Sequence, residues 1–300
     1  MPELPEVEAA RLLVDRHCTG KVVDAVKVLI EDEIIFKMLE KEKIRHCMQL
    51  FCGQKLVSTG RHGKYFWLTF CSEQGGNSTQ HLLIHLGMTG FVQIKGVERS
   101  FYRSAPEKPG QMDEWPPRFT RFLICFAPGN VEMCFGDARR LGRVIISPDV
   151  RGERVIKELG PDPLREDFFD FPAFHDALKR RSVPCKSLLL DQKFIAGIGN
   201  WMADDILLMA RLHPESIAGR LTEKQAKALH TSIIELSRVA VECKTLGKEY
   251  PLDWLFHIRW QRGTPSNTGS TLNKKRKTAQ LKIGGRTTVY CPSLQKKTPG

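Results

Sequence analysis

Hydrophobic and polar positions change their period about halfway along the 300-residue chain. Up to about residue 150, short β-branched and aromatic runs are separated by turn residues, a pattern typical of antiparallel strands. These runs cover 21–30, 55–58, 65–70, 81–85, 91–94, 122–126, 131–135 and 143–146. A polar, proline-rich stretch at 97–117 interrupts them and is expected to be a surface insertion. The first half therefore predicts an antiparallel β-sandwich.

Helical spacing precedes these runs and follows them. One helix is expected from about Pro5 through Val14, ending near Gly20, and four more over 168–180, 186–192, 200–212 and 222–244. The last opens with Thr222-Glu223-Lys224-Gln225, a capping box. Two strands, 260–263 and 287–290, are expected to pair across a long polar loop. The fold class is therefore α+β, divided into an N-terminal sandwich domain (1–148), a linker (149–163), a helical domain (164–250) and a C-terminal basic hairpin (251–300).

Composition excludes several classes of protein. With 41% hydrophobic residues the chain can form cores without disulfides or metals, and no apolar run is long enough to span a bilayer. No N-terminal stretch resembles a signal peptide, so we expect a soluble, intracellular protein. The nine cysteines are scattered without a C-x-x-C pair and are expected to be reduced thiols, mostly buried. No cofactor is predicted.

The net charge of +12 is concentrated at the C-terminal end. Residues 244–300 contain 12 lysines and arginines against two acidic residues. This segment is either a solvated basic tail or a basic folded element that faces a polyanion. Within it, the cluster Lys274-Lys275-Arg276-Lys277 is either a nuclear import signal or a solvated loop.

The first residues carry candidate chemistry. Once Met1 is removed, Pro2 is a secondary amine, which can condense with the aldehyde carbon of a sugar to give a positively charged iminium. The adjacent carboxyl group of Glu3 could then donate and accept protons. The alternative is that Pro5, Glu6 and their neighbours only start a helix, and both interpretations can hold together.

The segment Lys193 to Asn200 suggests a second functional position. Gly197 and Gly199 permit a close backbone approach, and Asn200 is expected to cap the following helix. The cap and the first free amides would form an anion site, whose ligand in a basic protein would be a DNA phosphate. An ordinary helical hairpin with a good cap is the alternative.

Five motifs now occur in one order along nearly the whole chain, and together they are very specific. They are Met1-Pro2-Glu3-Leu4-Pro5-Glu6-Val7-Glu8, Gly63-Lys64-Tyr65, His85-Leu86-Gly87-Met88-Thr89-Gly90, Asp137-Ala138-Arg139-Arg140-Leu141-Gly142 and Gly197-Ile198-Gly199-Asn200. The set resembles the formamidopyrimidine-DNA glycosylases of the Fpg/Nei family. The resemblance implies a bifunctional DNA glycosylase and AP lyase of base excision repair, which acts by β,δ-elimination. Its helical domain would be a helix-two-turns-helix domain, and its partner damaged double-stranded DNA.

The resemblance also implies roles for individual residues. Pro2 would attack C1′, Glu3 would supply acid and base steps, Lys64 would position the phosphate and the amine, and Glu6 would line the pocket. Met88, Arg139 and Leu141 would fill the space left by the extruded base, although many relatives have Phe where this chain has Leu141. The residues expected to contact phosphates are Lys186, Asn200 and Arg286, and Arg286 would also assist δ-elimination.

The C-terminus departs from zinc-bearing relatives. Ser266-Asn267-Thr268-Gly269 and Cys291-Pro292-Ser293-Leu294 stand where such relatives have two C-x-x-C pairs, and one thiolate cannot make a four-ligand site. We therefore expect a zinc-less finger of the plant type, held by strand pairing and packing. The protein is also expected to be monomeric and nuclear. The resemblance implies excision of ring-opened formamidopyrimidines, oxidised guanine products and oxidised pyrimidines. The stretch 247–260 is short beside bacterial relatives, so we expect ring-opened purines and further-oxidised guanine products to be processed better than 8-oxoguanine.

Two other classes remain as alternatives at this point. Tautomerase-like enzymes also use an N-terminal proline, as a general base, but they are short and lack a basic helical domain. A non-catalytic helix-two-turns-helix protein could bind nucleic acid without Pro2, Glu3 or Lys64. Other repair proteins could dock on the chain without leaving a recognisable motif.

Overall fold

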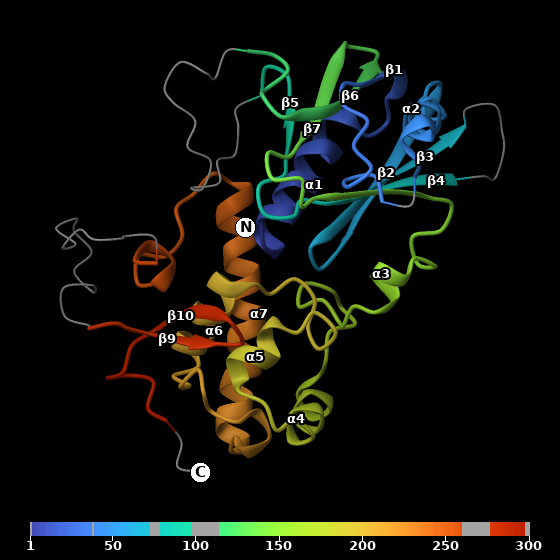
Figure 1. The fold of residues 1–300 in the computed structure, drawn as a ribbon. Coiled ribbons are helices and arrows are strands. Elements are labelled where there is room, and N and C mark those ends of the chain that lie inside the picture. Colours follow the sequence, from blue (N-terminus) through green and yellow to red (C-terminus); the bar gives the residue numbers. More distant parts are fainter. Residues whose placement is uncertain (1, 38, 73–78, 98–113, 260–276, 298–300) are drawn as a thin grey trace. The chain divides into compact units, whose positions relative to one another are not determined.

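The computed structural model describes residues 2–37, 39–72, 79–97, 114–259 and 277–297, and these form two compact units (Figure 1). Unit 1 is Met1–Glu158 and unit 2 is Leu159–Gly300. The boundary falls inside the predicted linker 149–163. In the part of the chain that is described, no helix is both long enough and apolar enough to cross a membrane.

Unit 1 combines three helices with eight strands among its described residues. The helices are α1 (Leu4–Cys18), α2 (Lys41–Gln49) and α3 (Arg154–Lys157). The strands are β1 (Val22–Val28), β2 (Gln54–His62), β3 (Tyr65–Ser72), β4 (Thr79–His85), β5 (Phe91–Ile94), β6 (Thr120–Ala127), β7 (Val131–Gly136) and β8 (Arg143–Ser147). Each of the predicted strands is present. The sequence did not predict α2, because only Ile44 and Met48 are buried in it and two apolar positions make a weak periodic signal.

The eight strands form one antiparallel sheet in the order β5-β7-β6-β1-β2-β3-β4-β8. Buried side chains from all of them belong to a single core, together with Val7, Ala10 and Val14 of α1. Because both ends of the sheet reach this core, the sheet bends around it as the predicted sandwich requires. The pairs β2–β3, β3–β4 and β6–β7 are local hairpins, and β1 with β6 is the pairing that joins the two halves. Helix α1 contacts both halves, so its first turn is held in place by the core.

Unit 2 is mainly helical. Its α-helices are α4 (Phe171–Lys179), α5 (Cys185–Leu190), α6 (Asn200–Met209) and α7 (Glu223–Thr245), with 3₁₀ turns η1 (Ala218–Arg220) and η2 (Leu255–His257). The capping box at Thr222 and Gln225 is confirmed. The expectation that Asn200 caps α6 is wrong. Gly199, which has an extended backbone, is the N-cap, and Asn200 is the first helical residue.

The strands of unit 2 are β9 (Ala279–Ile283) and β10 (Arg286–Tyr290), which form a tight hairpin. The predicted strand 287–290 is therefore present, but its partner in the hairpin is β9 rather than 260–263, which lies outside the described residues. The reason is the dipeptide Gly284-Gly285, whose φ values of +54° and +73° make the two-residue turn that suits strand twist. The polar loop named in the prediction, including Lys274 to Arg276, also lies outside the described residues, as does most of the expected insertion 97–117.

None of the nine cysteines, all of which the structure describes, forms a disulfide, as expected for reduced thiols. The expectation that most of them are buried is wrong, because four are buried and five are partly exposed. Burial raises the pKa of the Cys18 and Cys185 thiols to about 12, so both remain protonated and unreactive at neutral pH.

Candidate active site

Pro2 and Glu3 directly precede α1 and are buried, with Glu3 as the N-cap of the helix. Glu3 is 2% exposed and Glu6 is 6% exposed. The two glutamates form a reciprocal capping box, in which the Glu3 amide donates to the Glu6 carboxylate at 2.8 Å. Glu6 is therefore a buried helix cap and not a solvent-exposed acid at the start of the helix. Its carboxylate fixes the backbone next to Pro2, whereas a contact of Glu6 with DNA stays a prediction.

Lys64 lies at the tip of the β2–β3 hairpin. His62 pairs with Tyr65, so the turn consists of Gly63 and Lys64 alone. Gly63 has a φ of +58°, which a side chain would disfavour at this tight turn. Lys64 is partly exposed. The hairpin therefore presents the predicted lysine on a short, rigid turn.

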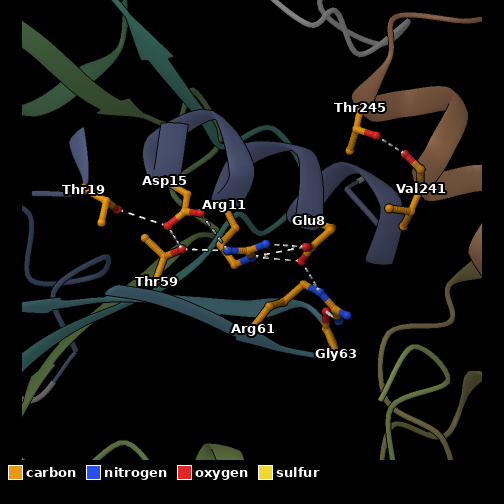
Figure 2. Close-up of polar contacts among 9 residues, drawn as sticks. All are labelled: Glu8, Arg11, Asp15, Thr19, Thr59, Arg61, Gly63, Val241 and Thr245. Carbon is orange, nitrogen blue, oxygen red and sulfur yellow. Dashed lines mark hydrogen bonds and ion pairs between the residues drawn. The ribbon is translucent and has the colours of Figure 1, made fainter. Parts of the chain in front are cut away.

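A polar network fastens this turn to α1 (Figure 2). Arg61 donates through Nε to Glu8 at 2.7 Å and through Nη1 to the carbonyl oxygen of Gly63 at 3.0 Å. Arg11, one turn beyond Glu8, donates to Glu8 at 2.6 Å and to the Thr59 hydroxyl at 2.7 Å. The helix that carries Pro2 and the turn that carries Lys64 are thus connected through one carboxylate.

Sequence reasoning missed Glu8 and Arg61 as parts of this site. In the sequence, Glu8 stands out only as an acidic residue near the start of the first helix, and Arg61 carries no signal. The pair spans 53 positions, so no local spacing signals it. Both side chains are largely buried, with 15% exposed for Glu8 and 6% for Arg61. Since breaking a buried pair leaves an uncompensated charge, the connection is expected to be persistent.

His85 is a further residue that the sequence did not single out by role. It ends β4, lies opposite Tyr65 in the sheet, and its ring centroid is 4.7 Å from that of Tyr65. Burial, together with the positive charges of Lys64 and Arg143, lowers the pKa of His85 to about 4. The neutral ring accepts the Gly87 amide through Nδ1 at 3.0 Å. His85 therefore joins the Lys64 turn to the loop that carries Met88.

Met88, Arg139 and Leu141 lie on two loops that one buried carboxylate holds together. Asp137 is completely buried and accepts the Thr89 hydroxyl at 2.5 Å and the amides of Arg139 and Leu141 at 3.1 and 2.8 Å. A guanidinium nitrogen of Arg139 in turn lies 3.4 Å from the sulfur of Met88. Met88 itself is not a core residue, because it lies partly exposed on the β4–β5 loop.

The wedge residue Leu141 is exposed, with 46% of its surface accessible. A large apolar side chain on a rigid loop is the kind of group that enters a base stack. Its neighbour Arg140 turns the other way and donates to both carboxylate oxygens of Asp32 at 2.8 and 2.9 Å. Although burial raises the pKa of Asp32, hydrogen bonds and charge from Arg140 and charge from Arg121 lower it overall. The pair fixes the loop from its other end.

In unit 2 the predicted phosphate contacts have partners within the protein. Lys186 is completely buried, and its Nζ donates to the Asn200 carbonyl oxygen at 2.7 Å and to Asp204 at 2.5 Å. The Asn200 side-chain amide donates to the Thr287 carbonyl oxygen at 3.0 Å. The structure thus brings Lys186 and Asn200 together, but it turns the ammonium inwards, and their contact with phosphate stays a prediction. Arg286 is exposed at the start of β10.

The end of the hairpin does not fit a structural zinc. Among the described residues there is no cluster of three or more His, Cys, Asp or Glu side chains that could hold a metal. The Cys291 sulfur lies 3.2 Å from the Ser293 hydroxyl, and the Gln295 side chain accepts the Cys291 amide at 2.7 Å. Gln295 also donates to the Leu212 carbonyl oxygen at 2.8 Å. An amide side chain thus closes the turn and ties it to the helical domain.

Comparisons with known proteins cover nearly the entire chain. Residues 1–144 match the sequence model of the formamidopyrimidine-DNA glycosylase N-terminal domain, and residues 159–250 match that of the formamidopyrimidine-DNA glycosylase H2TH domain. The chain is 35% identical over 296 residues to a formamidopyrimidine-DNA glycosylase of Arabidopsis thaliana, covering 99% of this chain and 71% of the relative. For the enzyme of Pelotomaculum thermopropionicum the identity is 30% over 308 residues, covering 99% of each chain. A crystal structure of the Lactococcus lactis protein with tetrahydrofuran-containing DNA and an inhibitor is similar, with a TM-score of 0.73, 25% identity and coverage of 99% and 100%.

Proposed function

Because the chain belongs to the formamidopyrimidine-DNA glycosylase family, we propose that it is a bifunctional DNA glycosylase and AP lyase whose nucleophile is the amine of Pro2. Family membership makes it a DNA glycosylase of base excision repair with damaged double-stranded DNA as its partner. The observation that carries the finer proposal is the buried pair of Pro2 and Glu3 at the N-terminal end of α1, fixed by Glu6.

The chemistry begins at the secondary amine. The nitrogen of Pro2 attacks C1′ of the damaged nucleotide, the bond from C1′ to the base breaks, and the base leaves with the bonding electrons and a proton. Glu3 protonates the ring oxygen of the sugar, which opens the ring and leaves an iminium between Pro2 and C1′. The iminium acidifies the C2′ protons, so loss of one of them expels the 3′ phosphate and a second elimination expels the 5′ phosphate. Water then releases the remaining sugar fragment from Pro2.

Positioning supports this sequence of steps. Lys64 is carried by a two-residue turn that Arg61 and Glu8 connect to α1, and its charge helps to keep His85 neutral. A cation held on such a turn can bind the phosphate beside the lesion while the neutral imidazole avoids competing for protons.

DNA recognition follows from the two loops organised by Asp137. The target nucleotide leaves the stack, Met88 and Leu141 occupy the space, and Arg139 donates to the orphaned base. Lactococcus lactis relatives are known in complex with DNA that contains an abasic site, which supports the same partner here. Leu141 is a smaller wedge than Phe, so discrimination between opposite bases is expected to be weak.

The lesion preference is also part of the proposal. The chain from the end of α7 to residue 260 is short, so it offers little cover for a bound 8-oxoguanine. We propose that ring-opened formamidopyrimidines, oxidised guanine products and oxidised pyrimidines are excised faster than 8-oxoguanine. Single-turnover excision from matched duplexes tests this, and equal or faster removal of 8-oxoguanine opposite cytosine would contradict it.

We further propose that the protein acts as a monomer in the nucleus. The support for the nucleus is the basic cluster Lys274 to Lys277, since runs of this kind are read by import receptors. A fluorescent fusion whose Lys274, Lys275, Arg276 and Lys277 are changed to Ala should lose nuclear enrichment, and unchanged enrichment would refute the role of the cluster. Sedimentation of the purified protein measures the oligomeric state.

Borohydride trapping on a duplex with an abasic site tests the nucleophile. Reduction of the iminium should give a stable adduct that mass spectrometry locates on Pro2. Pro2→Gly should weaken the adduct, because a primary amine gives an iminium that depends on a proton. Glu3→Gln should lose base excision more than strand nicking at an abasic site. An adduct on an internal lysine, or no adduct, would overturn the proposal and favour a non-catalytic DNA-binding protein.

A further inference from the structure

The β9–β10 hairpin, which has no metal site among its described residues, is attached to α6 through one buried carboxylate. Asp204 is 1% exposed, and its Oδ1 accepts the Lys186 ammonium at 2.5 Å. Its Oδ2 accepts the Val289 amide at 3.2 Å and also a guanidinium nitrogen of Arg259. A single side chain therefore joins α5, α6, the segment after α7, and the second strand of the hairpin.

Arg259 extends this attachment to the residue next to Arg286. Its Nη2 donates to the Thr287 carbonyl oxygen at 3.0 Å, while its Nη1 is bound to Asp204. The side-chain amide of Asn200 donates to the same Thr287 carbonyl oxygen at 3.0 Å. The planar fork of arginine can reach two acceptors at fixed geometry, whereas a lysine ammonium is a single point. Arg259 thus holds Thr287 against the first turn of α6.

The neighbouring acid of α6 fixes the chain that leads to Arg259. Asp205 is 1% exposed and accepts the amides of Leu255 and Phe256 at 2.5 and 3.1 Å. Burial raises the pKa of Asp205 well above its ordinary value. Trp201 packs on the same segment, with its ring centroid 5.1 Å from that of Phe256. Successive residues of one helix therefore place both the Arg259 backbone and its guanidinium.

The charges of this cluster decide which residue can be tested. Asp204 is one anion between two largely buried cations, Lys186 and Arg259. Removing Asp204 would leave both cations uncompensated in the interior, which is strongly destabilising. Removing the Arg259 charge leaves Asp204 paired with Lys186, so no buried charge is left without a partner. Substitution of Arg259 is therefore expected to release the hairpin without unfolding the domain.

We propose that Arg259 is a positioning residue that holds the hairpin on α6 in the way a structural metal would, and so places Arg286 for contact with a DNA phosphate. This inference rests on the proposed function to the extent that Arg286 contacts DNA. Thr287, whose carbonyl Arg259 grips, is the next residue after Arg286, so a shift of this carbonyl moves the Arg286 backbone directly. The reaction steps at Pro2 do not enter the argument.

Binding to a duplex that contains uncleavable tetrahydrofuran tests the proposal without any chemistry. Arg259→Met should weaken binding by roughly tenfold, because a well-placed hydrogen bond to a charged group contributes a factor of this order to affinity. Arg259→Lys should lose nearly as much, because it keeps the charge but not the fork. Arg165→Met, which removes the same charge from an exposed pair with Asp167 in the same unit, is the matched control and should bind as wild type does.

A double-mutant cycle separates positioning from general weakening. If Arg259 acts through Arg286, then Arg259→Met adds little to the loss already caused by Arg286→Met. If the losses of affinity caused by Arg259→Met and Arg286→Met multiply in the double variant, the inference is overturned. Wild-type affinity of Arg259→Met or of Arg286→Met alone would overturn it too. Hydrogen exchange should be faster at the Val289 amide of Arg259→Met and unchanged in α7, and faster exchange in both would show unfolding instead of release. A failed borohydride trap together with a coupled cycle would refute the nucleophile and leave this inference intact.

Discussion

Replacing Thr89 by Val should loosen the loop that carries Arg139 and Leu141. The Thr89 hydroxyl donates to Asp137 at 2.5 Å and accepts the Arg139 amide at 3.2 Å. Valine has nearly the same shape and can do neither. Asp137 would keep its bonds to the amides of Arg139, Leu141 and Gly142 at 3.1, 2.8 and 2.7 Å, so the loop should remain folded but open more often.

The size of the effect follows from the lost hydrogen bond to a charged group. Such a bond contributes about 1.5–3 kcal/mol, and water can replace part of it because Thr89 is partly exposed. We therefore expect a loss of about 2 kcal/mol in the free energy of local opening. At about 1.4 kcal/mol per factor of ten, this raises the open fraction roughly thirtyfold.

Hydrogen exchange measured by mass spectrometry on peptides covering 137–142 reports this opening directly. Thr89→Ser keeps the hydroxyl and is the matched control. Exchange of Thr89→Val should be faster than wild type by that factor, while Thr89→Ser should resemble wild type. Equal protection in Thr89→Val, or equal loss in both variants, would refute the argument that this hydroxyl holds the two loops together.

The remaining predictions concern pH, the Lys64 turn and metals. Because folding lowers the pKa of His85 from 6.5 to about 4, the unfolded chain binds an extra proton in this window, so stability falls as pH falls from 6.5 to 4. Urea unfolding at several pH values measures this dependence of the free energy of unfolding on pH. His85→Gln should reduce the change between pH 6.5 and 4 by up to about 3 kcal/mol. Glu8→Gln should lower the single-turnover excision rate by roughly tenfold, because it weakens the charge-assisted hydrogen bond to Arg61 that connects the Lys64 turn to α1. Glu33→Gln, on the exposed surface, is the control and should leave this rate unchanged. Dialysis against a chelator should leave the melting temperature and the excision rate unchanged, since Gln295 closes the hairpin end by hydrogen bonds.

The parts of the fold that the sequence predicted well are those whose signal is local. Alternating apolar residues within each strand reflect burial on one face, so strands such as 91–94 were found with the bounds that the structure has. The capping box at Thr222 depends on residues three positions apart. The first helix was found for the same reason, although it begins one residue earlier, at Leu4, and extends to Cys18.

The parts that were missed depend on partners far along the chain. The family motifs named Lys186 and Asn200, but nothing near either position signals that Asp204 and Thr287 occupy their polar atoms. The contact between Arg259 and Thr287 spans 28 positions and that between Glu8 and Arg61 spans 53. Gly284-Gly285 is the exception, because this dipeptide is a local signal for a hairpin turn, and it could have predicted the pairing of β9 with β10.

The seam between β1 and β6 has a kinetic consequence. Val28 pairs with Phe122, so this contact closes a loop of more than half of unit 1, whereas β2, β3 and β4 pair through short connections. Long loops close slowly, and each doubling of their length adds only about 0.6 kcal/mol of entropy loss. The two halves of the sheet are therefore expected to assemble separately and to join late in refolding. Lengthening the chain between β5 and β6 would then delay this last step, together with the pairing of β5 with β7, while leaving equilibrium stability almost unaltered.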